Sequence, residues 1–140
     1  MIRMSAELIA PCGMNCALCS RYQDWVQNRW TLTPCRGCRN DDKKCWALKR
    51  YCRHLREGDC SYCFECGEFP CERLQRLDRR FRKQYYLSVI DTLLRIRDVG
   101  VERFLEAQRE QWRCPQCGGV LCVQTGTCTV CGGAGRTGPR

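Results

Sequence analysis

The chain has 140 residues, a formal net charge of +9 and 16 cysteines. Its hydrophobic share of 44% counts the cysteines, and without them only about a third of the chain is apolar, too little for one well-packed core of ordinary size. No segment approaches the ~20 apolar residues of a membrane span, and the first residues lack the apolar run of a signal peptide. We therefore expect a cytoplasmic protein without a membrane partner, whose reduced thiols bind metal rather than form disulfides.

Residues 1–71 form the first region, a Cys-rich segment with little regular periodicity. Several of its cysteines are separated by two or three residues, and two thiolates from one such tight turn can hold one ion. The region is therefore predicted to have an irregular, metal-stabilised fold built from Cys knuckles. The candidate metal ligands here are Cys12, Cys16, Cys19, Cys35, Cys38, Cys45, Cys52, Cys63, Cys66 and Cys71.

Knuckle geometry favours two four-thiolate sites in this region. The expected sets are Cys16, Cys19, Cys35 and Cys38, and Cys45, Cys52, Cys63 and Cys66. The remaining thiols leave two alternatives open: a further site that recruits His54, or thiolates that bridge two ions. The spacing Cys12-x3-Cys16-x2-Cys19 is also that of an iron–sulfur cluster, which stays open as the alternative to zinc.

Residues 72–112 contain no cysteine and have the periodicity of helices. Ser88 followed by Asp91 resembles a capping box, so a helix is predicted to begin there and to end near Gly100. A further helix is predicted from about Val101 to Trp112, with its apolar face in the core. The first apolar stripe, at steps of three or four, consists of Leu74, Leu77, Phe81, Tyr85, Val89, Leu93 and Ile96.

Residues 113–134 have the spacing of a zinc ribbon, with two Cys-x2-Cys-Gly-Gly knuckles separated by a short segment. This pattern predicts a β-hairpin and a closed, structural four-thiolate site with Cys114, Cys117, Cys128 and Cys131 as ligands. Cys122 falls outside both knuckles and is expected to be an ordinary thiol, and residues 135–140 are expected to form a flexible tail. With the N-terminal sites, this gives about three or four zinc ions.

The order of these motifs resembles that of an uncharacterised prokaryotic family, domain of unknown function 3795. The resemblance is carried by CGMNCALCSRY, CRGCRN, the pair Cys45 and Cys52, and CFECGEFPCERL, and it continues to residue 119. It implies a small Cys-rich protein that binds metal and has no assigned reaction. His54, Cys60 and Cys122 lie outside the family's usual cysteine set.

The sequence gives little support for an enzyme, because it has one histidine, no phosphate-binding loop and no nucleophile elbow. We favour a metal-stabilised module that binds another protein, with iron–sulfur electron transfer as an alternative. A further alternative is binding of RNA or single-stranded DNA through Trp25, Trp30 or Trp46 and a basic run. That binding should be weak, because four thiolate-bound zinc ions would lower the net charge from +9 to about +1. The run comprises Arg73, Arg76, Arg79, Arg80, Arg82 and Lys83.

Overall fold

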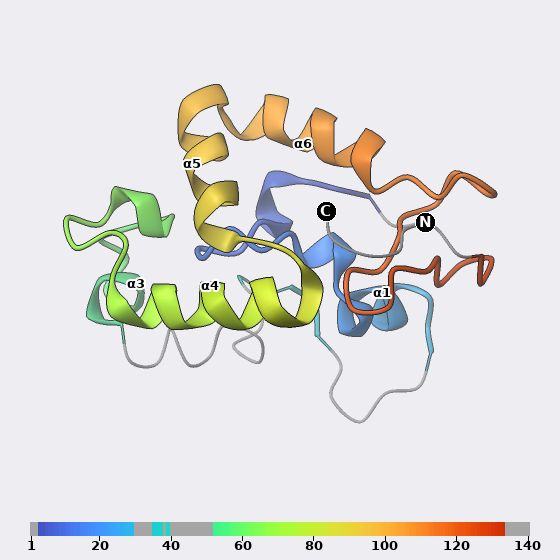
Figure 1. Cartoon of the computed structure of the whole chain (residues 1–140), viewed down its shortest axis with the longest axis horizontal. Coiled ribbons are helices and arrows are strands. Elements are labelled where there is room, and N and C mark those ends of the chain that lie inside the picture. The colour runs from blue at the N-terminus through green and yellow to red at the C-terminus, as the bar shows by residue number, and fades with distance from the viewer. Residues whose placement is uncertain (1–2, 30–34, 38, 40–51, 134–140) are drawn as a thin grey trace.

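The computed structural model describes residues 3–29, 35–37, 39 and 52–133 (Figure 1). Cys38, Cys45, Trp30, Trp46 and the predicted tail lie outside these residues. None of the helices in the described ranges is long and apolar enough to cross a membrane. The helices are α1 (Ser20–Val26), α3 (Arg53–Arg56), α4 (Glu72–Tyr85), α5 (Val89–Val99) and α6 (Val101–Gln111), with 3-10 turns η1 (Ala6–Leu8), η2 (Cys16–Leu18) and η3 (Cys63–Glu65).

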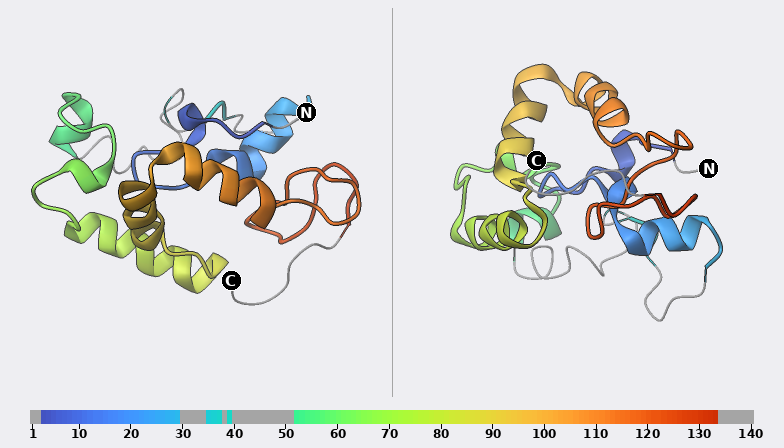
Figure 2. Two further views of the ribbon diagram at one scale, coloured as in Figure 1. Left: turned by 90° about the horizontal axis from the view of Figure 1, so that it is seen from above. Right: turned by 45° about the vertical axis from the view of Figure 1, so that its right-hand side comes forward.

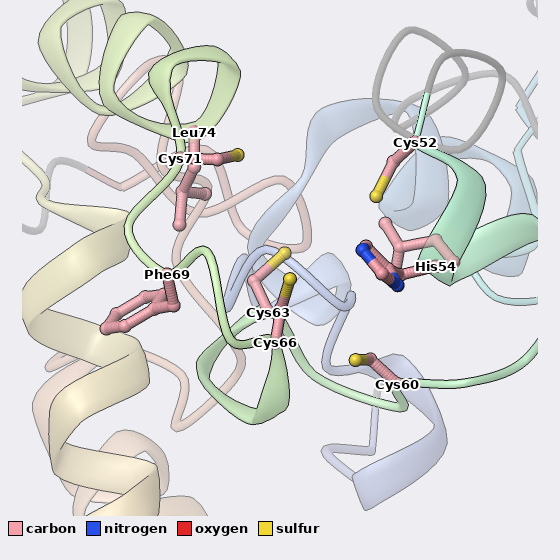
Figure 3. A pocket seen from close by; sticks show the side chains of 9 residues that line it. Cys52, His54, Cys60, Cys63, Cys66, Phe69, Cys71 and Leu74 are labelled. Atoms are coloured by element: carbon pink, nitrogen blue, oxygen red, sulfur yellow. The ribbon is translucent and has the colours of Figure 1, made fainter.

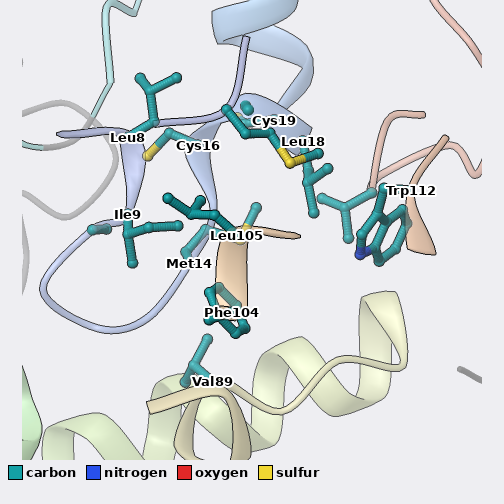
Figure 4. Close-up of a cluster of buried hydrophobic side chains, with 14 of the residues drawn as sticks. Leu8, Ile9, Met14, Cys16, Leu18, Cys19, Val89, Phe104, Leu105 and Trp112 are labelled. Atoms are coloured by element: carbon teal, nitrogen blue, oxygen red, sulfur yellow. The ribbon is translucent and has the colours of Figure 1, made fainter. Parts of the chain in front are cut away.

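The core is built around residues 8–19, which are buried without exception. Helix α5 packs against both α4 and α6, and the turns η3 and η1 pack against α5 and α6, respectively. Figure 4 shows how this arrangement places Ile9 and Met14 in one cluster with Val89, Phe104 and Trp112. The described part of the chain is therefore mostly helical. The helices of residues 72–112 are as predicted, and the central strip is an irregular segment rich in cysteine.

Gly13 allows the central segment to approach α5 closely. Its φ of +94° is a conformation that residues with a side chain rarely adopt. A Cβ atom at this position would lie 2.9 Å from Cγ of Leu93 and 3.0 Å from the carbonyl oxygen of Val89. Both the backbone conformation and the available space therefore require glycine.

The predicted break between α4 and α5 is confirmed. Tyr86, with a φ of 55°, ends α4 in the left-handed region. The Ser88 hydroxyl then accepts a hydrogen bond from the backbone N–H of Asp91 at 3.1 Å, and α5 begins at Val89. The buried carboxylate of Asp78 holds the two helices together, because it accepts hydrogen bonds from Ser88 Oγ at 2.7 Å and from the backbone N–H of Ile90 at 3.1 Å.

The predicted C-terminal β-hairpin does not appear in residues 113–133. This segment makes two isolated antiparallel bridges, Arg113 with Val120 and Leu121 with Cys128. One of its backbone donors is used outside the segment: the N–H of Val123 donates to the carbonyl of Leu18 at 2.8 Å instead of extending a ladder. The segment therefore lies beside α1 and η2, as Figures 1 and 2 show.

Candidate metal centres

The C-terminal segment brings its four predicted ligands together. The sulfur atoms of Cys114, Cys117, Cys128 and Cys131 all lie within 4.8 Å of one another. The Sγ atoms of Cys114 and Cys131 are 3.7 Å apart, and those of Cys117 and Cys128 are 3.5 Å apart. In a tetrahedral zinc site with Zn–S bonds of about 2.3 Å, the sulfurs are separated by roughly 3.8 Å. The four thiols therefore have the spacing of a closed site for one ion.

Two matching turns hold these sulfurs. In the first, the N–H of Gly118 donates to the carbonyl of Cys114 at 2.9 Å, and the N–H of Gly119 donates to Sγ of Cys117 at 3.4 Å. The second turn repeats these bonds at 2.8 Å and 3.4 Å. Gly118 and Gly132 have φ angles of +76° and +75°, which favour glycine. The Gly-Gly pair after each knuckle therefore turns backbone donors toward the sulfurs.

Hydrogen bonding gives thiols of this group different pKa values. The pKa of Cys114 falls to about 6, chiefly because the backbone N–H of Cys117 donates to its sulfur. The N–H of Gly119 acts to lower the pKa of Cys117, but its contacts with the neighbouring thiols and partial desolvation raise that pKa to about 12. One thiolate thus forms easily and disfavours the next, and a bound divalent cation relieves this repulsion.

A second group of thiols surrounds a small cavity between α3, η3 and the beginning of α4 (Figure 3). The cavity of about 20 Å³ is large enough for one water-sized particle. Leu55, Phe69 and Leu74 complete its wall. We call this site the thiol pocket, and its potential ligands are Cys52, His54, Cys60, Cys63, Cys66 and Cys71.

The thiol pocket is attached to the central segment at Cys63. The backbone N–H of Cys63 donates to the carbonyl of Pro11 at 2.9 Å, which places the pocket beside Cys12. The turn from Cys63 to Cys66 then resembles the C-terminal knuckles, because the N–H of Glu68 donates to Sγ of Cys66 at 3.4 Å. Burial raises the pKa of Cys63, and four neighbouring thiolates raise it further: Cys12, Cys71, Cys52 and Cys66. A cation in the pocket would reverse this effect.

Residues 8–76 match the model of a family described as protein of unknown function (DUF3795). This part of the chain is a DUF3795 domain. The resemblance predicted from the motif order is confirmed over this range, which contains the thiol pocket and the first turn of α4. Residues 77–119, to which the resemblance also extended, lie outside the match. Searches of curated proteins and of solved structures found no match to the chain.

Within the DUF3795 domain, the structure places the predicted thiols in two surroundings. The thiol pocket is lined by Cys52, Cys63 and Cys66, which are the described members of the set predicted with Cys45, and by Cys71. Of the other set, Cys16, Cys19 and Cys35 are at most 3% exposed, but their sulfurs do not form a mutually close group with the ligand atoms of described residues. The sulfur of Cys19 instead accepts a hydrogen bond from Nε2 of Gln124 at 3.4 Å, in the C-terminal segment.

The predicted basic run lies on α4, beyond the DUF3795 match for most of its length. Arg76 forms an ion pair with Glu72 at 2.6 Å, and Arg82 forms one with Asp78 at 2.7 Å. Carboxylates of the chain itself thus neutralise part of the run. Two of the tryptophans differ in exposure: Trp25 is 43% exposed, whereas Trp112 is fully buried in the core.

Two buried polar side chains, Gln23 and Asp78, hold neighbouring segments together and were not predicted from the sequence. Gln23 is fully buried and donates to the carbonyls of Ala17 and Leu121, at 2.9 Å and 3.1 Å. Its Oε1 accepts a hydrogen bond from the hydroxyl of Thr129 at 2.8 Å. Asp78 is the second buried group, and its i,i+4 spacing to Arg82 is a signal in the sequence for this pair.

Proposed function

We propose that this protein binds several zinc ions through cysteine, and that the metal-stabilised fold serves as a module for binding another protein. The C-terminal segment holds one closed, structural ion, and the thiol pocket of the DUF3795 domain holds at least one more. The proposal is carried by the four C-terminal sulfurs, which lie within 4.8 Å of one another.

The sulfur spacing favours a single ion over an iron–sulfur cluster in the C-terminal site. Thiolates that ligate a cluster bind different iron atoms of a larger body and lie farther apart than the 3.5 Å and 3.7 Å found here. Four thiolates and no open position are typical of structural zinc. The size of the thiol pocket, with space for one small particle, favours a single ion there as well.

The position of the C-terminal site explains what its metal would stabilise. Residues near the knuckles bond to α1 and η2: Val123 to Leu18, and Thr129 to Gln23. The side chain of Gln27 donates to Thr129 Oγ1 at 2.8 Å. An ion that orders the knuckles therefore also orders the surface that covers the DUF3795 domain.

Metal analysis of the full chain, purified without oxygen, tests this proposal. Inductively coupled plasma measurements should find at least two zinc ions per chain, and about three or four when the predicted site at Cys16, Cys19, Cys35 and Cys38 is filled as well. Cys117→Ser should lose one ion, because Cys117 belongs to the closed group. The matched control is Cys122→Ser, which changes a buried thiol outside that group and should keep the full complement. One ion or fewer in the unmodified chain, or equal losses in both variants, would contradict the proposal.

A further inference from the structure

We propose that His54, Cys66 and Glu68 form a separate metal site at the mouth of the thiol pocket, with one coordination position open to solvent. A ring nitrogen, a sulfur and a carboxylate oxygen from these residues all lie within 4.8 Å of one another. This site does not depend on the closed C-terminal site, with which it shares no residue.

Local structure brings the three ligands together. His54 lies on α3, and its Nε2 is 3.1 Å from Oε2 of Glu68. Glu68 follows Cys66 by two residues, and the N–H of Glu68 donates to the sulfur of Cys66. Figure 3 shows the His54 ring on the side of the pocket that carries Cys52, across from Cys63 and Cys66. The ring therefore faces a knuckle that already presents a sulfur.

The carboxylate of Asp59 lies near the second ring nitrogen of His54. Its Oδ2 is 3.6 Å from Nδ1 of His54, and the N–H of Asp59 donates to the carbonyl of His54 at 2.9 Å. Histidines that bind metal usually give their second ring N–H to a carboxylate, which fixes the tautomer. A proton on Nδ1, the nitrogen nearer Asp59, would leave the lone pair of Nε2 facing Glu68 and Cys66.

The ligand set selects the type of metal and leaves room for another ligand. One imidazole, one thiolate and one carboxylate suit a borderline divalent ion such as Zn²⁺ or Co²⁺. Three protein ligands leave the fourth tetrahedral position to water or a small anion, unlike the closed C-terminal site. The side chain of His54 is 30% exposed and that of Glu68 is 75% exposed, so the position is reachable from solvent.

A groove of about 550 Å³ leads from this site along α4. Arg53, Arg73 and Arg76 line it together with His54 and Cys66, although Arg76 is paired with Glu72. Positive charges beside an open metal position favour an anion as the exchangeable ligand. Cys66 also lines the thiol pocket, so its thiolate either bridges the pocket ion and the outer ion or binds the outer ion alone.

Cobalt titration of the full chain, without oxygen, tests the site. His54→Gln should bind one Co²⁺ fewer than the unmodified chain and keep the charge-transfer bands of the closed thiolate site. Glu68→Gln should bind this ion at least ~10-fold more weakly, and so should Asp59→Asn, which removes the carboxylate behind the histidine. The matched control is Glu57→Gln, an exposed carboxylate next to α3, which should bind cobalt as the unmodified chain does.

Two measurements on the unmodified chain do not depend on the folding of any variant. His54 is the one histidine of the sequence, so a paramagnetically shifted imidazole N–H resonance after Co²⁺ addition identifies it as a ligand. Azide should then shift the d–d bands of cobalt by replacing the water in the open position. Absence of the shifted resonance, or a full cobalt complement in His54→Gln, overturns this proposal even when Cys117→Ser loses its ion as expected.

Discussion

The buried amide of Gln23 joins two parts of the chain that are far apart in sequence, because its Nε2 donates to the carbonyl of Leu121 at 3.1 Å. The same nitrogen donates to the carbonyl of Ala17, and the amide oxygen accepts from Thr129. Both N–H groups and the oxygen of the amide are therefore used, and the bonds with Leu121 and Thr129 fasten the C-terminal segment to the DUF3795 domain.

Replacing Gln23 by Leu should lower the free energy of unfolding by about 2–4 kcal/mol, because two buried carbonyls lose a donor. The affinity of the C-terminal site for metal should fall as well, since its knuckles are then less firmly docked. Urea titration of the zinc-loaded chain measures the first effect, and competition with a chromophoric chelator measures the second. Gln84→Leu, an exposed position on α4, is the control. Equal stability of the two variants would show that the bonds of Gln23 contribute little.

Gly13→Ala should destabilise the chain by at least about 2 kcal/mol, because the new Cβ meets both an unfavourable φ and the backbone of α5. Gly58→Ala provides a useful comparison: its φ of +76° is also unfavourable, but a Cβ there has no neighbour within 4 Å. The midpoint temperature of thermal unfolding should therefore be well below that of Gly58→Ala in the Gly13→Ala variant. If the two variants melt together, the close approach to α5 is not a constraint.

Asp78 should make stability depend on pH in the acidic range. Burial favours its neutral form, but hydrogen bonds from Ile90 N–H, Ser88 and Arg82 prevail and lower the pKa of Asp78 below its ordinary value of 3.8. A carboxyl with a lowered pKa in the folded state stabilises the fold above its unfolded pKa, and this contribution is lost as pH falls through the folded value.

Asp78→Asn should consequently lower the free energy of unfolding by about 1.5–3 kcal/mol at pH 7, with the difference shrinking below pH ~4. Denaturant titrations at several pH values measure this. Asp98→Asn removes an exposed carboxylate that pairs with Arg97 on the surface and should change stability little. If Asp78→Asn lowered the free energy of unfolding equally at pH 3 and pH 7, the effect would come from side-chain packing and not from the charge of Asp78.

Nucleic-acid binding should be weak, with dissociation constants no tighter than about 10⁻⁶ M at physiological salt. Part of the basic run is already paired, as Arg76 is with Glu72 and Arg82 is with Asp78. Fluorescence anisotropy with a labelled single-stranded oligonucleotide of mixed sequence, repeated at several salt concentrations, measures the affinity. Nanomolar binding that is abolished in the double variant Arg79→Glu, Arg80→Glu would instead make nucleic acid the leading partner.

The sequence was a good guide where structure is local. The helices after Cys71 follow from a period of three to four residues, and the start of α5 follows from the capping residue Ser88. The predicted hairpin is not seen in residues 113–133, where Val123 gives its N–H to the carbonyl of Leu18, a bond that depends on tertiary packing. Ligand sets depend on the same kind of packing: Cys52 and Cys71 line one pocket because α3 and α4 meet there, which no spacing along the chain encodes.

The buried position of residues 8–19 bears on how the protein is made. A ribosome releases this segment before Val89, Leu105 and Leu121, which cover it in the folded protein. Until then, the cysteine-rich strip is accessible to metal, oxidants and chaperones. The DUF3795 match ends at residue 76, before most of that covering has been translated. The core can therefore be completed only after residue 121 has been translated, and nonsense or frameshift changes even near residue 121 should leave the N-terminal strip exposed to proteases.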